Sequence, residues 1–227
     1  MVRCPKCSSE GCTKDGMAKG RQRYRCKACD YRHTVSYRGI NPAIKRQALQ
    51  LYLEGLGFRS IGRFLNCSHV AVYNWINAYG ESIESIRSTA GVEVVEMDEM
   101  HTYFGSKKNY CWIWMAVDRN GKRFLHCEVG SRGTETGRKL WEAIEDQPIT
   151  QVMTDYWRPY GQFVPKELYT QSKAETYTVE GYNSLFRHFL ARLHRKSKCY
   201  SKSKIMLKYS VMLLMLKWNG ELDAILN

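Results

Sequence analysis

The sequence lacks any apolar run long enough to cross a membrane. A spanning helix needs about 20 consecutive apolar residues, and the longest run here, residues 209–218, is much shorter. The N-terminus, MVRCPKC, also lacks the apolar segment of a secretory signal peptide. With 44% hydrophobic and 25% charged residues, the chain has the composition of a globular protein. We therefore expect a cytoplasmic, nucleoid-associated protein with no membrane partner.

Acidic residues are scarce, because 22 Asp and Glu stand against 35 Lys and Arg, a formal net charge of +13. The imbalance is uneven: residues 1–90 carry a net +9, residues 91–170 a net −2 and residues 171–227 a net +6. Basic flanks favour a polyanionic partner such as DNA, since Lys and Arg that neutralise phosphates release counterions. The slightly acidic middle favours cations.

Nine cysteines in a chain without a secretory signal favour metal binding or burial over disulfides. Four of them form two Cys-x2-Cys pairs, CPKC and CKAC, separated by eighteen residues. Each pair can direct two thiolates at one tetrahedral ion, so the spacing predicts a zinc ribbon over residues 1–40 with one structural Zn²⁺. Its expected ligands are Cys4, Cys7, Cys26 and Cys29. Disulfides or free thiols are the alternative.

Between the cysteine pairs, the segment GMAKGRQRYRC favours a hairpin that leads into the second pair. The segment has too few apolar residues for a core, so we expect the ion to hold it together. Its arginines are candidates for phosphate contacts, although a solvated surface is an equal alternative: Arg21, Arg23 and Arg25.

Residues 41–80 have the pattern of a helix-turn-helix. Asn41 and Pro42 favour a helix start, the GLG sequence at 55–57 breaks that helix, and Ser68 is a cap for a third. We expect five residues to be buried between the helices: Ile61, Leu65, Val70, Val72 and Ile76. In such a motif the last helix enters the major groove, and the candidate DNA contacts are Ser68, His69, Tyr73 and Asn74. A helical bundle without DNA is the alternative.

After a linker at 81–91, residues 92–200 alternate strands and helices. Strands are expected at 92–97, 111–117, 124–129 and 149–155, helices at 133–146 and 177–198, and turns at 105–109 and 118–122. This order predicts an α/β ribonuclease-H-like catalytic domain, in which the first and fourth strands lie side by side. A basic, amphipathic C-terminal helix is expected within 201–227.

That topology would bring Asp98 and Asp155 together, with Glu180 added from the helix that follows. Three carboxylates supply the hard oxygen ligands that Mg²⁺ prefers. Two such ions, about 3.5–4 Å apart, can activate a nucleophile and stabilise the leaving oxygen of a phosphodiester. Each acid alone is more often a strand end or a helix cap. The competing acids are Glu96, Glu99, Asp118 and Glu175.

Three stretches resemble the insertion-sequence-one family of bacterial DDE transposases: EMDEMHTYFGSKKNYCWIWMAVD, VMTDYWRPY and YTVEGYNSLFRHFLARLHRKS. The resemblance implies a DDE triad at Asp98, Asp155 and Glu180, two Mg²⁺ per active site with Mn²⁺ as a substitute, and recognition of element ends by the N-terminal modules. It extends over nearly the whole chain.

The leading hypothesis is a transposase that binds the inverted repeats of an insertion sequence, cuts each strand end and joins it to target DNA. Double-stranded DNA is the expected partner, and a homodimer or larger homo-oligomer is expected because two ends are joined. Candidate backbone contacts are Lys107, Lys108, Arg187, Arg192, Arg195 and Lys196. The alternatives are a zinc-ribbon helix-turn-helix repressor without catalysis, and a ribonuclease-H-like nuclease without strand transfer.

Overall fold

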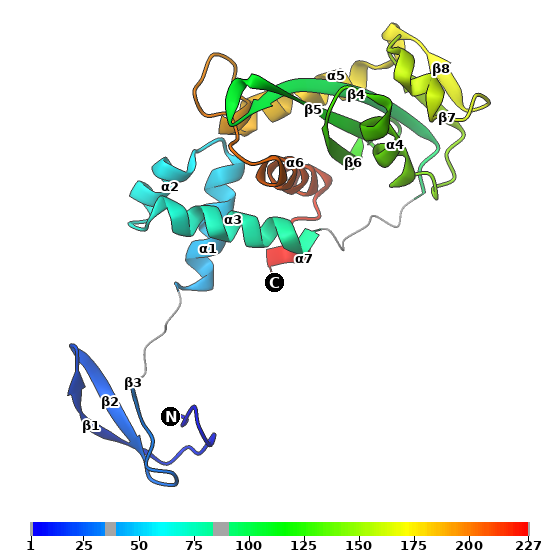
Figure 1. Cartoon of the computed structure of the whole chain (residues 1–227). Coiled ribbons are helices and arrows are strands. Elements are labelled where there is room, and N and C mark those ends of the chain that lie inside the picture. Colours follow the sequence, from blue (N-terminus) through cyan, green and yellow to red (C-terminus); the bar gives the residue numbers. More distant parts are fainter. Residues whose placement is uncertain (1, 35–39, 84–90, 227) are drawn as a thin grey trace. The chain divides into compact units, whose positions relative to one another are not determined.

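The computed structural model describes residues 2–34, 40–83 and 91–226. The chain divides into two compact units, residues 1–42 and residues 43–227, and each is described by itself (Figure 1). The expected linker at 81–91 falls mostly on 84–90, outside the described residues. In the described part of the chain, no helix combines the length and the apolar composition needed to span a bilayer.

The first unit is a three-stranded antiparallel sheet, with the strands β1 (Cys12–Ala18), β2 (Arg21–Cys26) and β3 (Arg32–Thr34) in that order. The chain turns between β1 and β2 at Lys19 and Gly20, which both have positive φ. This confirms the hairpin expected before the second cysteine pair. Among residues 2–34, only the side chains of Cys4 and Cys26 are buried, so the unit has almost no apolar core.

The second unit begins with the three expected helices, α1 (Pro42–Leu53), α2 (Phe58–Phe64) and α3 (His69–Ile83). Ser68 Oγ accepts a hydrogen bond from the Ala71 backbone N–H at 3.0 Å, which confirms Ser68 as the cap of α3. The expected burial of Val70 is wrong, because its side chain is 53% exposed. Helical spacing places Val70 on the same side of α3 as Tyr73 and Asn74, which are also exposed.

A five-stranded mixed sheet follows, with the strand order β6-β5-β4-β7-β8. Its strands are β4 (Val94–Phe104), β5 (Ser106–Asp118), β6 (Arg123–Gly130), β7 (Gln151–Thr154) and β8 (Tyr169–Gln171). The first and fourth of these, β4 and β7, pair in parallel from Val94↔Gln151 to Met97↔Thr154. The expected adjacency of these two strands is therefore confirmed.

The hairpin between β4 and β5 is longer than expected. Both strands extend well past the apolar runs, and the turn expected at 105–109 is instead centred on Gly105, whose φ of +69° allows the chain to reverse there. Lys107 and Lys108 consequently lie at the start of β5. Opposite them, the pairing is irregular between Tyr103 and Phe104 of β4.

The helices of this unit are shorter than expected. They are α4 (Thr134–Glu142) and α5 (Tyr177–Phe189), with three 3₁₀ turns, η1 (Arg158–Gln162), η2 (Lys173–Glu175) and η3 (Ala191–Leu193). The helix expected over 177–198 ends at Phe189 because Leu190 adopts an extended conformation. Leu190 and Leu193 are buried in the observed arrangement, as they would be expected to be in a continuous helix, so apolar spacing could not distinguish a continuous helix from a helix followed by a 3₁₀ turn.

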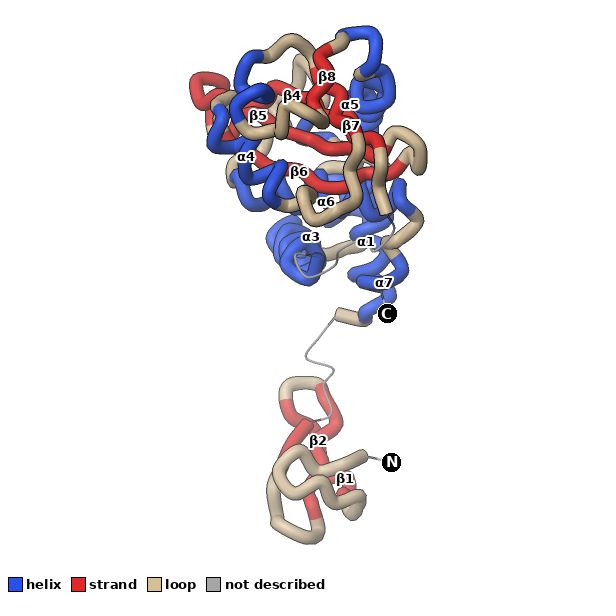
Figure 2. The backbone as a smooth tube through the Cα atoms, turned by 90° about the vertical axis from the view of Figure 1, so that its right-hand side faces the viewer, coloured by secondary structure: helices blue, strands red, loops and turns tan. Residues whose placement is uncertain are grey.

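The C-terminal helices are α6 (Lys204–Asn219) and α7 (Asp223–Leu226). Within residues 43–227, α6 lies between the sheet and the helices α1 and α3, as two perpendicular views show (Figures 1 and 2). It is buried on most sides rather than along one amphipathic face, because apolar side chains of both layers pack against it. The Tyr52 hydroxyl also donates to Ser210 Oγ at 2.7 Å, so one core holds the helix-turn-helix against the sheet.

A substitution at Gly80 of α3 tests the packing of this shared core. A Cβ at this position would lie 2.3 Å from the ring of Tyr209 in α6. We expect Gly80→Ala to destabilise residues 43–227 by about 1–3 kcal/mol, as overpacking does. Urea unfolding followed by tryptophan fluorescence measures this directly, since all six tryptophans lie beyond residue 42. The matched control is Gly181→Ala in α5, where a Cβ meets nothing within 4 Å. A Gly80→Ala midpoint equal to or above that of the control would contradict the packing argument.

Candidate catalytic site and metal centre

Three carboxylates that are distant in sequence line one cavity of about 270 Å³. Asp98 and Asp155 come directly after Met97 and Thr154, the last paired residues of β4 and β7, and Glu180 lies in the first turn of α5. The parallel pairing therefore places the two aspartates next to each other in register. We call this the triad cavity, and its lining residues are Asp98, Asp155, Tyr156, Trp157, Lys173 and Glu180.

The triad carboxylates differ from the competing acids in their partners. Among the described residues, none of the three has a basic side chain within ion-pair distance, whereas all four competitors do. Glu96 and Glu175 pair with Arg119, Asp118 pairs with Arg123, and Glu99 pairs with Arg132. The four acids that pair with arginine have a structural role in this geometry, and the three acids without a basic partner share the cavity.

The triad carboxylates accept only neutral hydrogen-bond donors in the described part of the chain. Asn183 Nδ2 donates to Asp98, the Trp157 backbone N–H donates to Asp155 at 2.9 Å, and Thr176 Oγ1 donates to Glu180 at 3.4 Å. These contacts orient the carboxylates without neutralising them. The oxygens of the three groups do not all lie within 4.8 Å of one another, so the site is wider than one that closes on a single ion.

Glu96 anchors the helix that carries Glu180. Its side chain is completely buried, and Oε2 accepts hydrogen bonds from the backbone N–H groups of Thr178 and Val179, both at 2.9 Å. These are among the N–H groups that a helix start leaves without partners, and a carboxylate there also suits the helix dipole. Arg119 Nε lies 3.3 Å from the other oxygen, at ion-pair distance but not aligned as a hydrogen bond.

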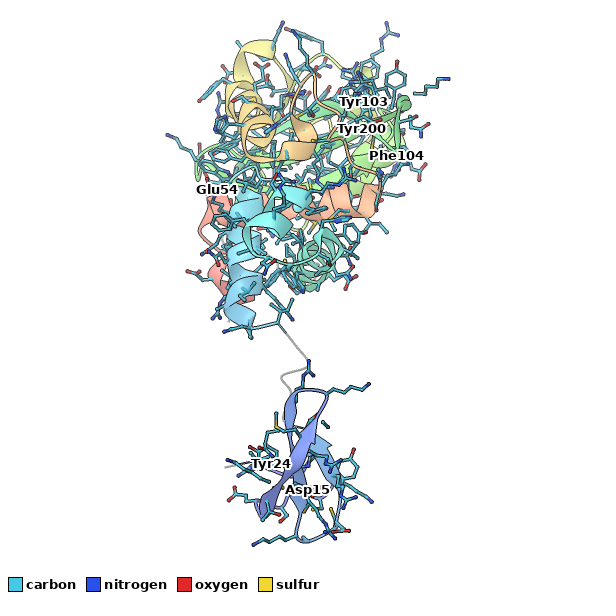
Figure 3. All side chains as sticks on the ribbon, turned by 90° about the vertical axis from the view of Figure 1, so that its left-hand side faces the viewer. Asp15, Tyr24, Glu54, Tyr103, Phe104 and Tyr200 are labelled. Atoms are coloured by element: carbon cyan, nitrogen blue, oxygen red, sulfur yellow. The ribbon has the colours of Figure 1, made fainter. Side chains whose placement is uncertain are left out.

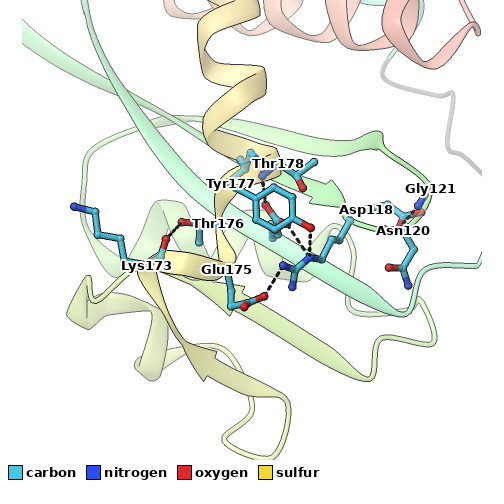
Figure 4. Close-up of polar contacts among 11 residues, drawn as sticks. Asp118, Asn120, Gly121, Lys173, Glu175, Thr176, Tyr177 and Thr178 are labelled. Carbon is cyan, nitrogen blue, oxygen red and sulfur yellow. Dashed lines mark hydrogen bonds and ion pairs between the residues drawn. The ribbon is translucent and has the colours of Figure 1, made fainter.

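Arg119 extends this anchor to the segment before α5. It pairs with Glu175, and its guanidinium lies 4.8 Å from the centre of the Tyr177 ring. Figure 4 shows Glu175 and Lys173 projecting to opposite sides of this segment. Lys173 thereby remains available to the triad cavity, which it lines, while Glu175 is held on the other side by Arg119.

The environment of Asp98 disfavours its charged form. Burial raises the pKa of Asp98 to about 6, and the nearby Asp155 and Glu180 carboxylates add to the rise. Hydrogen bonds from the Glu99 backbone and from Asn183 oppose the shift without cancelling it. A bound cation would remove this cost, because it favours the ionised form. The donor set, three carboxylates that make no ion pair with a basic side chain among the described residues, therefore fits a hard divalent ion.

The four cysteines of the first unit form a second candidate metal centre. Their sulfurs all lie within 4.8 Å of one another, with Cys4 3.6 Å from Cys29 and Cys7 3.6 Å from Cys26. Disulfide sulfurs are about 2.05 Å apart, whereas Zn–S bonds of about 2.3 Å in a tetrahedron separate sulfurs by about 3.8 Å. The backbone N–H groups of Cys29 and Ala28 lower the pKa of Cys26 to about 6, whereas hydrogen bonding to Cys7 and burial raise the pKa of Cys29 to about 12. A bound cation would favour the thiolate form of both. The cluster fits Zn²⁺.

The residues predicted to contact DNA differ in their exposure and in their ion pairs. In the first unit Arg21 is exposed, but Arg23 pairs with Asp15 and Arg25 with Asp30. In the second unit the exposed candidates are Ser68, His69, Tyr73, Asn74, Lys107, Lys108, Arg195 and Lys196, while Arg187 is half-buried. Arg192 is only 9% exposed, donates to Ser201 and packs over the rings of Tyr52 and Phe58.

Sequence reasoning missed two features of the site. Lys173 has no local signal, because it lies in a 3₁₀ turn without periodicity. The anchoring role of Glu96 had a partial signal: strand alternation puts Glu96 and Asp98 on the same face of β4, next to whatever packs there. Which helix that would be was not readable from the pattern.

Comparison with known proteins identifies two regions of the chain. The model of the IS1 transposase family matches residues 92–216, and a homeodomain-like domain model matches residues 41–87. The chain belongs to the IS1 transposase family.

Several relatives share this family. The chain is 33% identical over 110 residues to the insertion element iso-IS1n protein InsB of Shigella dysenteriae, covering 48% of this chain and 84% of the relative. It is 36% identical over 108 residues to the insertion element IS1 4 protein InsB of Escherichia coli (strain K12), covering 48% of this chain and 65% of the relative.

Among solved structures, the catalytic core domain of BIV integrase matches with 14% identity and a TM-score of 0.35, over 54% of this chain and 84% of that one. This score is too low to support a structural argument, so family membership rests on the sequence matches.

Metal removal tests the cysteine cluster. We expect the purified IS1-family chain to hold about one Zn²⁺, and Cys7→Ser to hold much less, because three thiolates bind more weakly than four. Chelation should alter the circular dichroism of the first unit, which the ion is expected to hold together. The unfolding of residues 43–227 detected by tryptophan fluorescence should stay unchanged, because the first unit lacks tryptophan. Cys67→Ser, which removes a cysteine outside the cluster, is the matched control. Equal zinc content in the two variants would refute the assignment.

The raised pKa of Asp98 predicts a stability cost in the metal-free protein. Since the folded state binds this proton more tightly than the unfolded chain does, stability is lost as the pH rises from about 4 through about 6. Asp98→Asn removes the charge and keeps an acceptor for Asn183. We expect the variant to be more stable than the parent at pH 7.5 by up to about 3 kcal/mol.

The same comparison at several pH values supplies the control. The difference in the free energy of unfolding between Asp98→Asn and the parent should shrink as the pH falls below about 6. Added Mg²⁺ should stabilise the parent and leave the variant unchanged. A variant that is less stable than the parent at every pH would rule out the cost of holding an ionised Asp98 in the triad cavity, which comes from burial and then from the neighbouring carboxylates.

Proposed function

We propose that this IS1-family chain is a transposase with a ribonuclease-H-like catalytic domain, in which Asp98, Asp155 and Glu180 act together on phosphodiester bonds. The observation that carries the proposal is the shared triad cavity: three carboxylates from β4, β7 and α5, each without a basic partner among the described residues. Family membership supports the same function.

Two Mg²⁺ ions, or Mn²⁺ in their place, held by these three carboxylates would activate a water or a DNA 3′-hydroxyl and stabilise the leaving oxygen. The remaining roles fall to the chain itself. Asn183 and the Trp157 backbone orient Asp98 and Asp155, and Glu96 fixes the start of the helix that presents Glu180. Lys173 also lines the triad cavity, and its positive charge would suit contact with a DNA phosphate.

Recognition of the element's inverted repeats is proposed for the N-terminal modules. The exposed side chains of His69, Tyr73 and Asn74 project from the start of α3, the helix that enters the major groove in this motif. Arg59, Arg63 and Ser68 border an open surface cavity beside it, which suits the DNA backbone. Arg21 and the zinc ribbon add further positive charge. Joining two ends requires a homodimer or larger assembly.

The decisive experiment compares binding with cleavage. We expect Asp155→Asn and Glu180→Gln to abolish Mg²⁺-dependent nicking of a duplex that carries an element end, with losses of at least about 1,000-fold. Gel-shift affinity for the same duplex should change less than about 3-fold, because these residues lie away from α3. The matched control is Glu175→Gln, which alters an acid that pairs with Arg119 and should retain measurable nicking.

Strand transfer is tested with the labelled 3′-end of the nicked strand and a plasmid target. Joined product supports transposition, whereas nicking without joining would indicate a nuclease. A parent chain that binds element ends and never nicks them would leave the repressor alternative.

A further inference from the structure

A second cavity of about 510 Å³ lies farther along β4 and α5 than the triad cavity. We call it the basic cavity; β4 contributes His101 and Tyr103 to it, and α5 contributes Arg187. Five basic residues line it, and no Asp or Glu does: Lys107, Arg187, Arg192, Arg195 and Lys196. Tyr103 and Tyr200 lie close together at this end of the molecule (Figure 3).

The charge in the basic cavity is not neutralised within the described part of the chain, where none of the five basic residues has an acidic ion-pair partner. Burial, and then the nearby Arg195, lower the pKa of Arg187. Arg192 is 9% exposed, and its Nε has no hydrogen-bond partner. Five basic side chains gathered without a lining carboxylate favour an anion such as a DNA phosphate in the basic cavity.

An aromatic surface adjoins this cavity on the β4–β5 hairpin. We call it the aromatic platform, and it consists of His101, Tyr103, Tyr110 and Trp112. The His101 ring centre lies 4.8–5.2 Å from the other three, and Tyr110 is 67% exposed. His101 Nε2 is buried without a hydrogen-bond partner. Tyr110 is exposed and the other three rings are half-buried, and rings accessible beside positive charge suit stacking with bases.

A chain of side-chain contacts links the platform to the triad cavity. The Arg132 guanidinium lies between two tryptophans, 4.4 Å from the ring centre of Trp112 and 3.9 Å from that of Trp157. Trp157 lines the triad cavity, so rings and a guanidinium connect the two sites. On α5, Glu180 and Arg187 are seven residues apart, about 10 Å along the helix, and spacing places them on one side of it.

We propose that the basic cavity and the aromatic platform bind an unpaired segment of the DNA strand that passes through the triad cavity, with phosphates in the cavity and bases on the rings. This inference rests on the proposed function. A positively charged groove with adjacent stacking rings characterises single-stranded nucleic-acid sites. Bases within a duplex are stacked on each other and cannot cover Tyr103 and Tyr110, so the strand must be locally unpaired.

The test measures binding of the full chain to a fluorescein-labelled thymidine octamer by fluorescence anisotropy without Mg²⁺. We expect Tyr103→Ala/Tyr110→Ala to weaken binding by about 10-fold or more, since each stacked base contributes about 1–3 kcal/mol. Arg187→Ala should weaken binding and lower the slope of log affinity against log salt by about one. The matched control is Trp218→Ala, an exposed aromatic that lines neither cavity, and it should bind as the parent does.

A second readout locates the contact. An octamer with one 5-iododeoxyuridine should crosslink under ultraviolet light to the peptide that carries Tyr103 or Tyr110. Unchanged octamer affinity in the tyrosine double variant, or crosslinks confined to other peptides, would overturn the proposal. Loss of affinity in Arg187→Ala alone would also overturn it, because a phosphate site without stacking does not require unpaired DNA.

The outcome is separable from that of the proposed function. Gel-shift binding of duplex ends should be unaffected by the tyrosine changes, because it depends on α3 and the zinc ribbon. A chain that nicks DNA but binds the octamer independently of the platform keeps the transposase proposal and loses this one. A chain that binds the octamer through the platform and never nicks DNA keeps this proposal and loses the transposase proposal.

Discussion

The parallel pairing of β4 with β7 is the constraint on which the candidate site depends. The pairing stops at Met97↔Thr154, so the next residue of each strand is an aspartate placed at the end of the ladder. A shift of one residue would turn Asp98 to the opposite face of the sheet and replace it with Glu99 or Met97. Val95 and Val152 are both fully inaccessible and belong to one apolar cluster, and they fix that register because a one-residue slip would turn Val95 out of the cluster.

The carboxylates of β4 differ in the face of the sheet on which they lie and in the groups that they bind. Glu96 and Asp98 share one face of β4, but Glu96 is committed to the start of α5, while Glu99 on the other face is committed to Arg132 and to the Tyr160 hydroxyl. The hydrogen bonds of Glu96 hold α5, and with it Glu180, in place. If α5 shifted, the buried Glu96 carboxylate would be left without hydrogen-bond donors. The repulsion left among the remaining three is then a local cost, which a divalent cation offsets.

Local patterns predicted those features that short-range chemistry decides. The two cysteine pairs, the Ser68 cap and the adjacency of the first and fourth strands follow from spacing, capping and topology, and the structure has all three. Tertiary packing decided the rest. The burial of α6 depends on what lies on both sides of it, and α5 ends where Leu190 becomes extended and the chain enters η3, whose Arg192 packs over Tyr52 and Phe58. The basic cavity joins residues from β4, α5 and η3, so no single segment carries its signal.

The shared core under α6 has a consequence for how DNA reaches the triad cavity. Ile76 of α3, Leu213 of α6 and Ile113 of β5 belong to one buried cluster, so α3, the helix proposed to bind duplex DNA, cannot move relative to the sheet without opening that core. Close-packed interiors resist such displacement. The more deformable partner is therefore the DNA, whose bending or unstacking requires only a few kcal/mol. A rigid protein that must deform its substrate benefits from a surface that binds the deformed strand, which is the chemistry that the basic cavity and the aromatic platform offer.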